Sequence, residues 1–415
     1  MKLFLVAVPM FDRDMAVQAY MLNYRSSEKL FGTSGNYAQL DGAMNSPGIE
    51  LLEKIGLEPF TGGKPIFVPV TKFLLLADIS SRCSIAPELM GCVFTNDIPN
   101  EEEYISKIVD LKSKGYWIAI ENIDLTVENE IFYRLADYVI FDATSNLFSR
   151  KFTQFFNQYP NKRAVFSNVN RLEIYDQLKI HASFLFQGKF FNQPFTKGTT
   201  KVSPVKANAL HLLKIVGEEN FDLEEVGNII NKDPAIALSL MKFVNSPAIR
   251  TGNKVNSLKN AVALLGQNEI RKWITVTVSS RLAEDKPNEL AKLSLVRAKF
   301  AENLSGIYSM DVHSSSLFIM GLFSLLDVIL DKTMQEALEE ISVNDKVRDA
   351  LQNHRGEFAD ILKMIYAYEQ ADWSEVSYML ILKNISAEDV SKAFIDALVW
   401  YRDLLKGLSA DDELD

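Results

Sequence analysis

Residues that could bind a metal ion or act as a nucleophile are few in this chain and far apart. It has four histidines; none precedes an aspartate, and no two lie within one helical turn. Catalytic ions such as zinc need several protein ligands that converge on one point. Each histidine is therefore expected to be a surface or packing residue. The four are His181, His211, His313 and His354.

The two cysteines, Cys83 and Cys92, lack the CxxC spacing of metal and redox sites. This excludes a disulfide framework and predicts two partly buried thiols in a reducing compartment. No apolar run reaches the roughly 18 residues that span a bilayer, and the first apolar stretch becomes polar too early for a signal peptide. The sequence thus predicts a cytoplasmic protein without membrane insertion.

Acidic residues after apolar runs are the remaining candidates for cation binding. Glu121 follows the run Trp117–Ile120, Asp124 lies three residues further on, and Asp142 follows Tyr138–Phe141. A site that holds two divalent cations needs oxygen ligands from several strand ends. Acids such as Glu121 and Asp124 are more often solvated loop residues, by about four to one, and Asp142 fits a turn.

The composition is that of a soluble globular protein with a large core. The chain has 415 residues, 47% of them hydrophobic and 24% charged, and this length predicts two or three domains. A formal net charge of -10 argues against a general binder of phosphate backbones. Nucleic acid is therefore not an expected partner.

The first half alternates short apolar runs with helical patterns. The clearest helical pattern is Glu101–Gly115, which has acidic residues in its first turn and glycine at its end. Repeated alternation of strand and helix predicts a parallel sheet closed into a (β/α) barrel. The predicted strands are Leu3–Val8, Ala19–Arg25, Pro65–Val70, Trp117–Ile120, Tyr138–Phe141, Ala164–Phe166 and Phe184–Phe186.

The second half is predicted to be all-helical. Asp233 and Pro234 form a helix start, and apolar residues follow on one face until Asn245-Ser246-Pro247 breaks the helix. A further helix begins behind Ser257 and ends near Gly266, and another follows at once. The order VNSPAI, SLKNAVALLG, then Ile-Arg-Lys-Trp resembles HDOD domains, which are helical bacterial signalling modules related to HD phosphohydrolases.

The barrel half resembles EAL domains, which hydrolyse cyclic di-GMP at a two-metal carboxylate site. The similar stretches are PMFDRDMAVQAYMLNYR from Pro9, GYWIAIENI from Gly115 and FLFQGKFFNQP from Phe184. EAL domains have metal ligands and a lysine at fixed motif positions. The resemblance implies that only one of the residues at these positions is a carboxylate in this chain. It therefore implies that the chain binds no metal and no other cofactor. These positions are Met21, Pro69, Val93, Glu121, Asn122, Ile140 and Asn170.

The helical half lacks the His-Asp pair of its catalytic relatives in the same way. The resemblance places Ser324 and Leu325 where an active HD enzyme carries that pair. Both ligand sets are thus missing, and the sequence predicts a pseudo-enzyme. The fold class is α/β plus all-α: a degenerate (β/α) barrel of TIM type over 1–196, a linker over 197–206 and an HDOD domain over 207–415.

This combination resembles proteins that join a degenerate EAL barrel to an HDOD module. It implies a non-catalytic scaffold in cyclic di-GMP signalling, with cyclases, kinases or response regulators as partners; a homodimer stays open. The alternative is a cyclic di-GMP-binding sensor or residual phosphodiesterase. The turn after the helix from Pro234, where binding residues tend to gather, is the predicted partner surface, with even odds that it is only a corner. Its residues are Asn245, Ser246, Pro247, Arg250 and Lys254.

Overall fold

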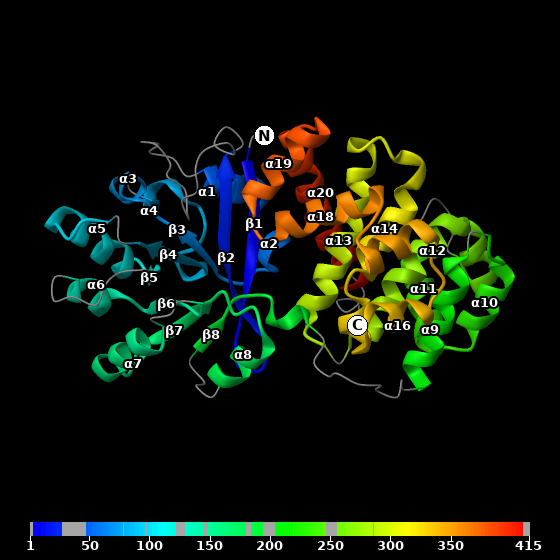
Figure 1. The fold of residues 1–415 in the computed structure, drawn as a ribbon, viewed down its shortest axis with the longest axis horizontal. Coiled ribbons are helices and arrows are strands. Elements are labelled where there is room, and N and C mark those ends of the chain that lie inside the picture. Colours follow the sequence, from blue (N-terminus) through cyan, green and yellow to red (C-terminus); the bar gives the residue numbers. More distant parts are fainter. Residues whose placement is uncertain are drawn as a thin grey trace. The chain divides into compact units, whose positions relative to one another are not determined.

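The computed structural model divides the chain into two compact units (Figure 1). It describes residues 3–26, 47–77, 79–95, 98–121, 129–144, 148–179, 184–193, 204–218, 220–245, 255–284 and 286–409. The first unit comprises 1–193 and 367–391, and the second comprises 194–366 and 392–415. The break after Gln193 lies near the boundary expected at 196, whereas 367–391 were expected in the helical domain. The expected linker lies largely outside the described residues.

Eight strands of the first unit form a closed barrel in sequence order, as the alternating pattern predicted. The strands are β1 (Leu3–Phe11), β2 (Val17–Ser26), β3 (Ile66–Pro69), β4 (Met90–Phe94), β5 (Trp117–Glu121), β6 (Tyr138–Asp142), β7 (Arg163–Ser167) and β8 (Phe184–Phe186). Neighbours from β2 to β8 pair in parallel, but β1 is antiparallel to both β2 and β8. The cause is a tight β1–β2 turn, in which the Asp12 carboxylate accepts hydrogen bonds from the backbone of Asp14 and Ala16.

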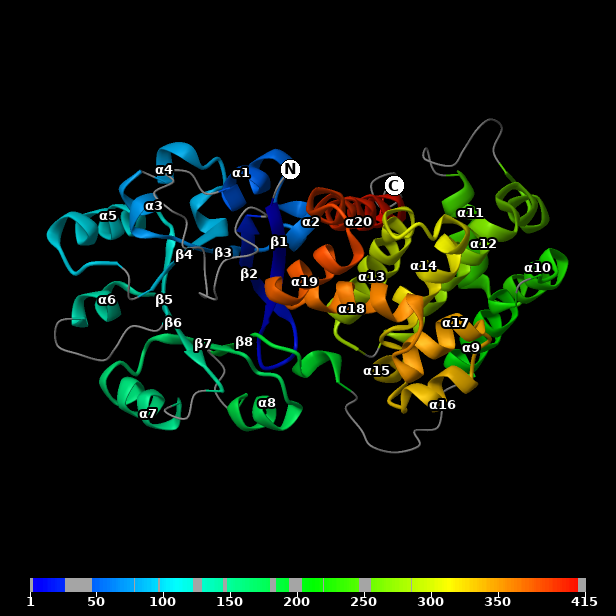
Figure 2. The same cartoon turned by 45° about the horizontal axis from the view of Figure 1, so that its top comes forward.

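The helices between the strands lie around the outside of the barrel (Figure 2). The longest of them, α5 (Glu102–Ser113), agrees with the predicted helix, and Gly115 follows it with φ +96°. The others are α1 (Pro47–Ile55), α2 (Glu58–Thr61), α3 (Lys72–Leu76), α4 (Ile79–Arg82), α6 (Glu130–Leu135), α7 (Phe148–Gln158) and α8 (Leu172–Leu178).

Strand β4 was not predicted from the sequence. Its residues MGCVF contain a glycine, which weakens a strand pattern. Packing explains the glycine, because a Cβ at Gly91 would lie 2.5 Å from the ring of Phe67. That ring makes an edge contact with Tyr138 inside the barrel, with centroids 5.2 Å apart.

A segment from the end of the chain covers strand β1 of the same unit. It contains the last residues of α18 (Glu357–Glu369), all of α19 (Trp373–Lys383) and the first turn of α20 (Ala387–Ser409). The rings of Tyr368 and Trp373 each lie 5.6 Å from Phe4, and the Ser391 hydroxyl donates to the Leu3 carbonyl. The barrel is therefore packed against residues that lie far beyond its own strands in sequence.

We expect Trp373→Ala to destabilise the barrel unit by about 3–5 kcal/mol, because it removes a buried aromatic side chain. Trp373→Phe is the matched control; it keeps a ring against Phe4 and loses the indole hydrogen bond to Asn23, for a cost of about 1 kcal/mol. Urea denaturation of the full chain measures both. Equal stability of Trp373→Ala and wild type would show that the C-terminal segment does not support the barrel.

The second unit is all-helical, as predicted. Besides parts of α18 and α20, its described helices are α9 (Pro204–Gly217), α10 (Leu223–Asn231), α11 (Pro234–Asn245), α12 (Leu258–Leu282), α13 (Asn288–Ile307), α14 (Ser314–Phe323), α15 (Leu326–Leu330), α16 (Met334–Glu339) and α17 (Asp345–Arg348). Asp233 accepts hydrogen bonds from the backbone of Ala235 and Ile236 at the start of α11, and Ser257 caps α12, whose helix is interrupted at Gly266 (φ 69°, ψ 177°).

A carboxylate on α13 joins two helices of this unit. Glu302 is bonded to Lys272 at 2.6 Å and to Lys299 at 2.8 Å, and its side chain is 12% exposed. Burial alone would raise its pKa, but hydrogen bonds and charges from the two lysines outweigh burial and hold the pKa of Glu302 below its ordinary value. A depressed pKa stabilises the fold above the carboxyl's unfolded pKa, and this stabilisation is lost as the pH falls through the folded pKa.

We therefore expect Glu302→Gln to lower the free energy of unfolding by about 1.5–3 kcal/mol at neutral pH. The difference from wild type should shrink in acid, below the carboxyl's unfolded pKa of about 4.3. Denaturation curves at neutral and acidic pH measure it. A loss that is the same at both pH values would mean that packing, and not the charge of Glu302, links these helices.

Candidate functional site at the barrel mouth

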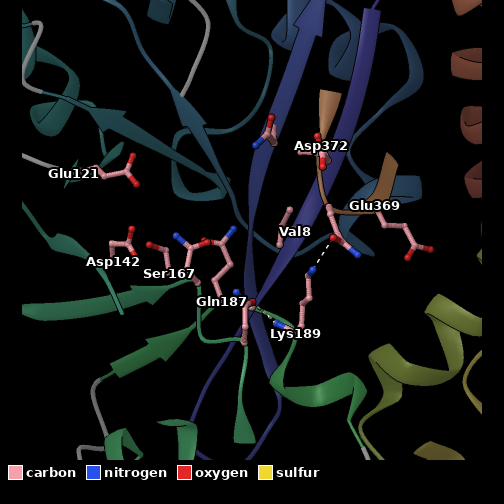
Figure 3. Close-up of a pocket in the computed structure, with 14 residues that line it drawn as sticks. Val8, Glu121, Asp142, Ser167, Gln187, Lys189, Glu369 and Asp372 are labelled. Atoms are coloured by element: carbon pink, nitrogen blue, oxygen red, sulfur yellow. Dashed lines mark hydrogen bonds between the residues drawn. The ribbon is translucent and has the colours of Figure 1, made fainter. Parts of the chain in front are cut away.

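A polar cavity of about 440 Å³ lies at the carboxyl ends of β5 to β8 within the first unit. Active sites of (β/α) barrels lie at this end of the strands. Figure 3 shows Glu121, Asp142 and Ser167 on one side of the cavity and Lys189 and Asp372 on the other, with Val8 between them. The lining residues are Val8, Asn23, Glu121, Asp142, Ser167, Asn168, Asn170, Gln187, Gly188, Lys189, Glu369, Gln370, Ala371 and Asp372.

Two carboxylates reach the cavity from adjacent strands. Glu121 ends β5 and is 7% exposed. Asp142 ends β6, and its Oδ1 accepts hydrogen bonds from the Thr144 backbone at 2.8 Å and the Thr144 hydroxyl at 2.7 Å. Burial would raise the pKa of Asp142, but these bonds and one from Asn168 lower it below the ordinary value. Asp142 is therefore ionised at neutral pH and also forms the turn that the sequence predicted for it.

The loops after β7 and β8 form the floor between these carboxylates and the rest of the cavity. A Cβ at Gly188 would lie 2.1 Å from the Val169 carbonyl oxygen, so glycine is required where the loops meet. Asn170 accepts a hydrogen bond from the Lys189 backbone at 3.3 Å, and the Val169 backbone donates to the Gln187 carbonyl at 3.0 Å. Gln187 and Gly188 thus shape the turn after β8.

The ligand-like positions named from the sequence fall into separate environments. Met21, Val93 and Ile140 belong to the apolar filling of the barrel interior. Pro69 ends β3 and is buried, while Glu121 and Asn170 line the cavity. Asn122 lies outside the described residues. Among the described residues no three His, Cys, Asp or Glu side chains are grouped so that they could hold a metal ion.

The helical unit places its HD-like positions in a buried polar contact. Ser324 accepts a hydrogen bond from the Arg297 guanidinium at 3.0 Å and donates to the Gly321 carbonyl, while Leu325 is 3% exposed. Arg297 also lies over the Tyr366 ring at 4.7 Å. Arg297 is thus held by the Ser324 hydroxyl and the Tyr366 ring, and none of these contacts involves a histidine. The role predicted for Ser324 and Leu325, as degenerate positions, stays a prediction.

Of the residues predicted to form the partner surface, the structure describes Asn245. The Asn245 side chain donates to the carbonyls of Met241 and Val255 and accepts a bond from the Val255 backbone at 2.8 Å. Asn245 therefore fixes the end of α11 to the chain that follows. The remaining residues of that surface, Ser246, Pro247, Arg250 and Lys254, lie outside the described residues.

The cavity also contains residues that the sequence did not single out. Asn23, Lys189, Gln370 and Asp372 come from strand β2, the loop after β8 and the turn between α18 and α19. The Lys189 ammonium donates to Gln370 at 2.6 Å across 181 residues of sequence. No local sequence pattern links such distant residues, so their place in the cavity could not be predicted from the sequence alone.

The fold and the cavity define a protein that combines a barrel with a ligand-sized polar mouth and an all-helical module. Residues 203–367 match the family model of the HDOD domain, so the helical module contains an HDOD domain. This confirms the HDOD resemblance. None of the described helices combines the length and hydropathy that a bilayer span requires.

Two curated proteins are similar over nearly the whole chain. The uncharacterized protein YuxH of Bacillus subtilis (strain 168) is 28% identical over 98% of this chain and 99% of its own. The cyclic di-GMP phosphodiesterase CdgJ of Vibrio cholerae serotype O1 is 26% identical over 95% of this chain and 91% of its own. The resemblance to proteins of the EAL and HDOD type is thereby confirmed.

Solved structures similar to this chain include two EAL proteins. The EAL enzyme Bd1971, bound to cAMP and cyclic di-GMP, is 10% identical over 46% of this chain and 62% of its own, with a TM-score of 0.35. A standalone EAL protein from Vibrio cholerae O395 in its c-di-GMP-bound form is 16% identical over 49% of this chain and 96% of its own, with a TM-score of 0.34.

The comparison with CdgJ contradicts the prediction that this chain is not an enzyme, because a relative aligned over 95% of it is named a phosphodiesterase. That prediction counted oxygen ligands only at the positions of the EAL motifs. The cavity has further carboxylates outside that set, at Asp142, Glu369 and Asp372. Missing residues at fixed motif positions are therefore insufficient to exclude chemistry at this mouth.

Proposed function

We propose that this chain acts in cyclic di-GMP signalling, with the barrel mouth as the site that receives the cyclic dinucleotide. The observation that carries the proposal is the polar cavity at the strand ends, whose volume of about 440 Å³ lies in the range of small-molecule sites. The similarity to a protein named a cyclic di-GMP phosphodiesterase supports the choice of ligand. The second part of the proposal is that the HDOD domain acts through protein partners in the cytoplasm, at a surface that includes Arg250 and Lys254.

The charges of the cavity determine how such a ligand would bind. Its described walls carry four carboxylates, at Glu121, Asp142, Glu369 and Asp372, against one ammonium at Lys189. A cyclic dinucleotide has two phosphate groups, so carboxylates alone would repel it. A divalent cation placed between carboxylate and phosphate removes this repulsion.

Glu121 and Asp142 are the residues that fit such a cation. Magnesium is commonly held by one or two protein carboxylates together with water and the phosphates of its ligand. Two carboxylates from adjacent strands satisfy this requirement for one ion, whereas the described residues offer no larger group for a protein-only pair of metals. When bound, the ion would supply charge neutralisation and polarise a phosphate oxygen.

We expect calorimetry to show magnesium-dependent binding of cyclic di-GMP with a Kd below about 10 μM, which corresponds to roughly -7 kcal/mol. Removal of magnesium by EDTA should weaken binding at least about tenfold. Glu121→Gln combined with Asp142→Asn should abolish this magnesium dependence. Asp176→Asn is the matched control, because Asp176 is exposed on α8 and pairs with Lys179 outside the cavity.

Hydrolysis is measured in the same samples by chromatography of the nucleotide. Turnover that the double variant abolishes and Asp176→Asn retains would assign catalysis to the mouth as well. Absence of binding to the folded wild-type protein, with and without magnesium, would overturn the proposed function.

A further inference from the structure

The cavity wall opposite Glu121 and Asp142 comes from the turn between α18 and α19, which belongs to the same unit as the barrel. The turn has a defined backbone. The Asp372 backbone N–H donates to the Ala367 carbonyl, and the Ala371 N–H donates to that of Tyr368, which is the bonding pattern of a Schellman motif. Ala371 has φ +54°, a conformation that usually requires glycine. These hydrogen bonds give the turn a defined backbone conformation.

One consequence of this turn is that Gln370 meets the barrel. Its side-chain oxygen accepts a hydrogen bond from the Lys189 ammonium at 2.6 Å. Lys189 is in turn fixed through its backbone N–H, which donates to Asn170. The only cation among the described lining residues therefore has a set position beside the turn.

A second consequence is that Trp373 orients Asn23. The indole nitrogen can only donate, and it donates to Oδ1 of Asn23 at 3.1 Å. The amide NH₂ of Asn23 is therefore the part left for the cavity that this residue lines. The indole is held by the rings of Phe4 and Tyr368 and is 6% exposed, so this orientation is supported by packing.

A third consequence concerns Asp372. One oxygen, Oδ1, accepts a hydrogen bond from the Glu375 backbone at 3.1 Å and caps α19. Within the described part of the chain no group donates to the second oxygen, Oδ2. A carboxylate fixed through one oxygen presents its acceptor in a defined direction.

All three residues line the cavity, which thus has an acceptor at Asp372 and donors at Asn23 and Lys189. The Watson–Crick edge of guanine carries the complementary pattern, with N1–H and N2–H₂ as donors next to O6 as an acceptor. Adenine has an acceptor at N1 and would meet the carboxylate with a lone pair. A site built for donors rejects a ligand that lacks them, because its own polar groups are then unpaired.

We propose that Asp372, with Asn23 and Lys189, forms a guanine-reading subsite at the mouth of the barrel. The cyclic dinucleotide would then lie with a phosphate toward Glu121 and Asp142 and a base toward the turn. This inference rests on the proposed function, since it assigns the base to a ligand whose phosphates bind at the strand ends. Specificity would come from a segment that lies about 180 residues beyond the barrel strands in sequence.

The test compares cyclic di-GMP, cyclic di-AMP and cyclic di-inosine monophosphate by calorimetry with the full chain and magnesium. We expect the wild type to prefer cyclic di-GMP over cyclic di-AMP by roughly 10–100-fold. Cyclic di-inosine monophosphate lacks the N2 amino group and should bind with intermediate affinity. Asp372→Asn retains a capping side chain for α19 but replaces the carboxylate, so the preference should fall below about threefold.

Two variants keep this test independent of folding. Asn23→Asp retains an acceptor for Trp373 while removing the donor, and it should also weaken cyclic di-GMP selectively. Asp176→Asn should leave the preference unchanged. If the wild type prefers cyclic di-GMP and Asp372→Asn preserves that preference, the subsite is wrong while the proposed function stands. If the folded wild type binds none of the three ligands, the proposed function itself fails.

Discussion

The closed ring of eight strands around an apolar interior is the constraint on which the rest of the first unit depends. Met21, Val93 and Ile140 fill that interior together with Phe67 and Tyr138, so it is packed with largely apolar side chains. Polar groups can gather only where the strands end and the backbone turns outward. Closure of the ring brings the ends of β5 to β8 together and thereby creates one polar mouth.

The barrel is completed by residues from the other end of the chain. Burial of Phe4 against Tyr368 and Trp373 stabilises the packing of 367–391 on β1, and the same packing sets the turn that carries Asp372. One hydrophobic contact thus has two effects: it covers a strand, and it positions polar atoms at the mouth. The same aromatic residues therefore support both the stability of the barrel and the position of the proposed ligand contacts.

Much of the architecture could be predicted because it follows from local patterns. Seven of the strands and the caps at Asp233 and Ser257 agree with the apolar periods and helix-start residues of the sequence. Strand β4 was not predicted because it contains Gly91, which leaves room for the ring of Phe67 on the neighbouring strand. The antiparallel direction of β1 depends on hydrogen bonds in the β1–β2 turn, which the sequence does not show. The cavity wall from Gln370 to Asp372 meets the barrel through a contact between residues far apart in sequence. Hydrophobic periodicity predicts local elements and not such contacts.

The central claim is that strand ends and the α18–α19 turn form one ligand site. Hydrogen–deuterium exchange of the full chain, with cyclic di-GMP and magnesium compared with neither, tests it most directly. We predict slower exchange of backbone amides both in the loops after β7 and β8, including Lys189, and in the turn up to Glu375, with smaller changes elsewhere in the barrel. Binding that protects the loops and leaves the turn unchanged would contradict the account.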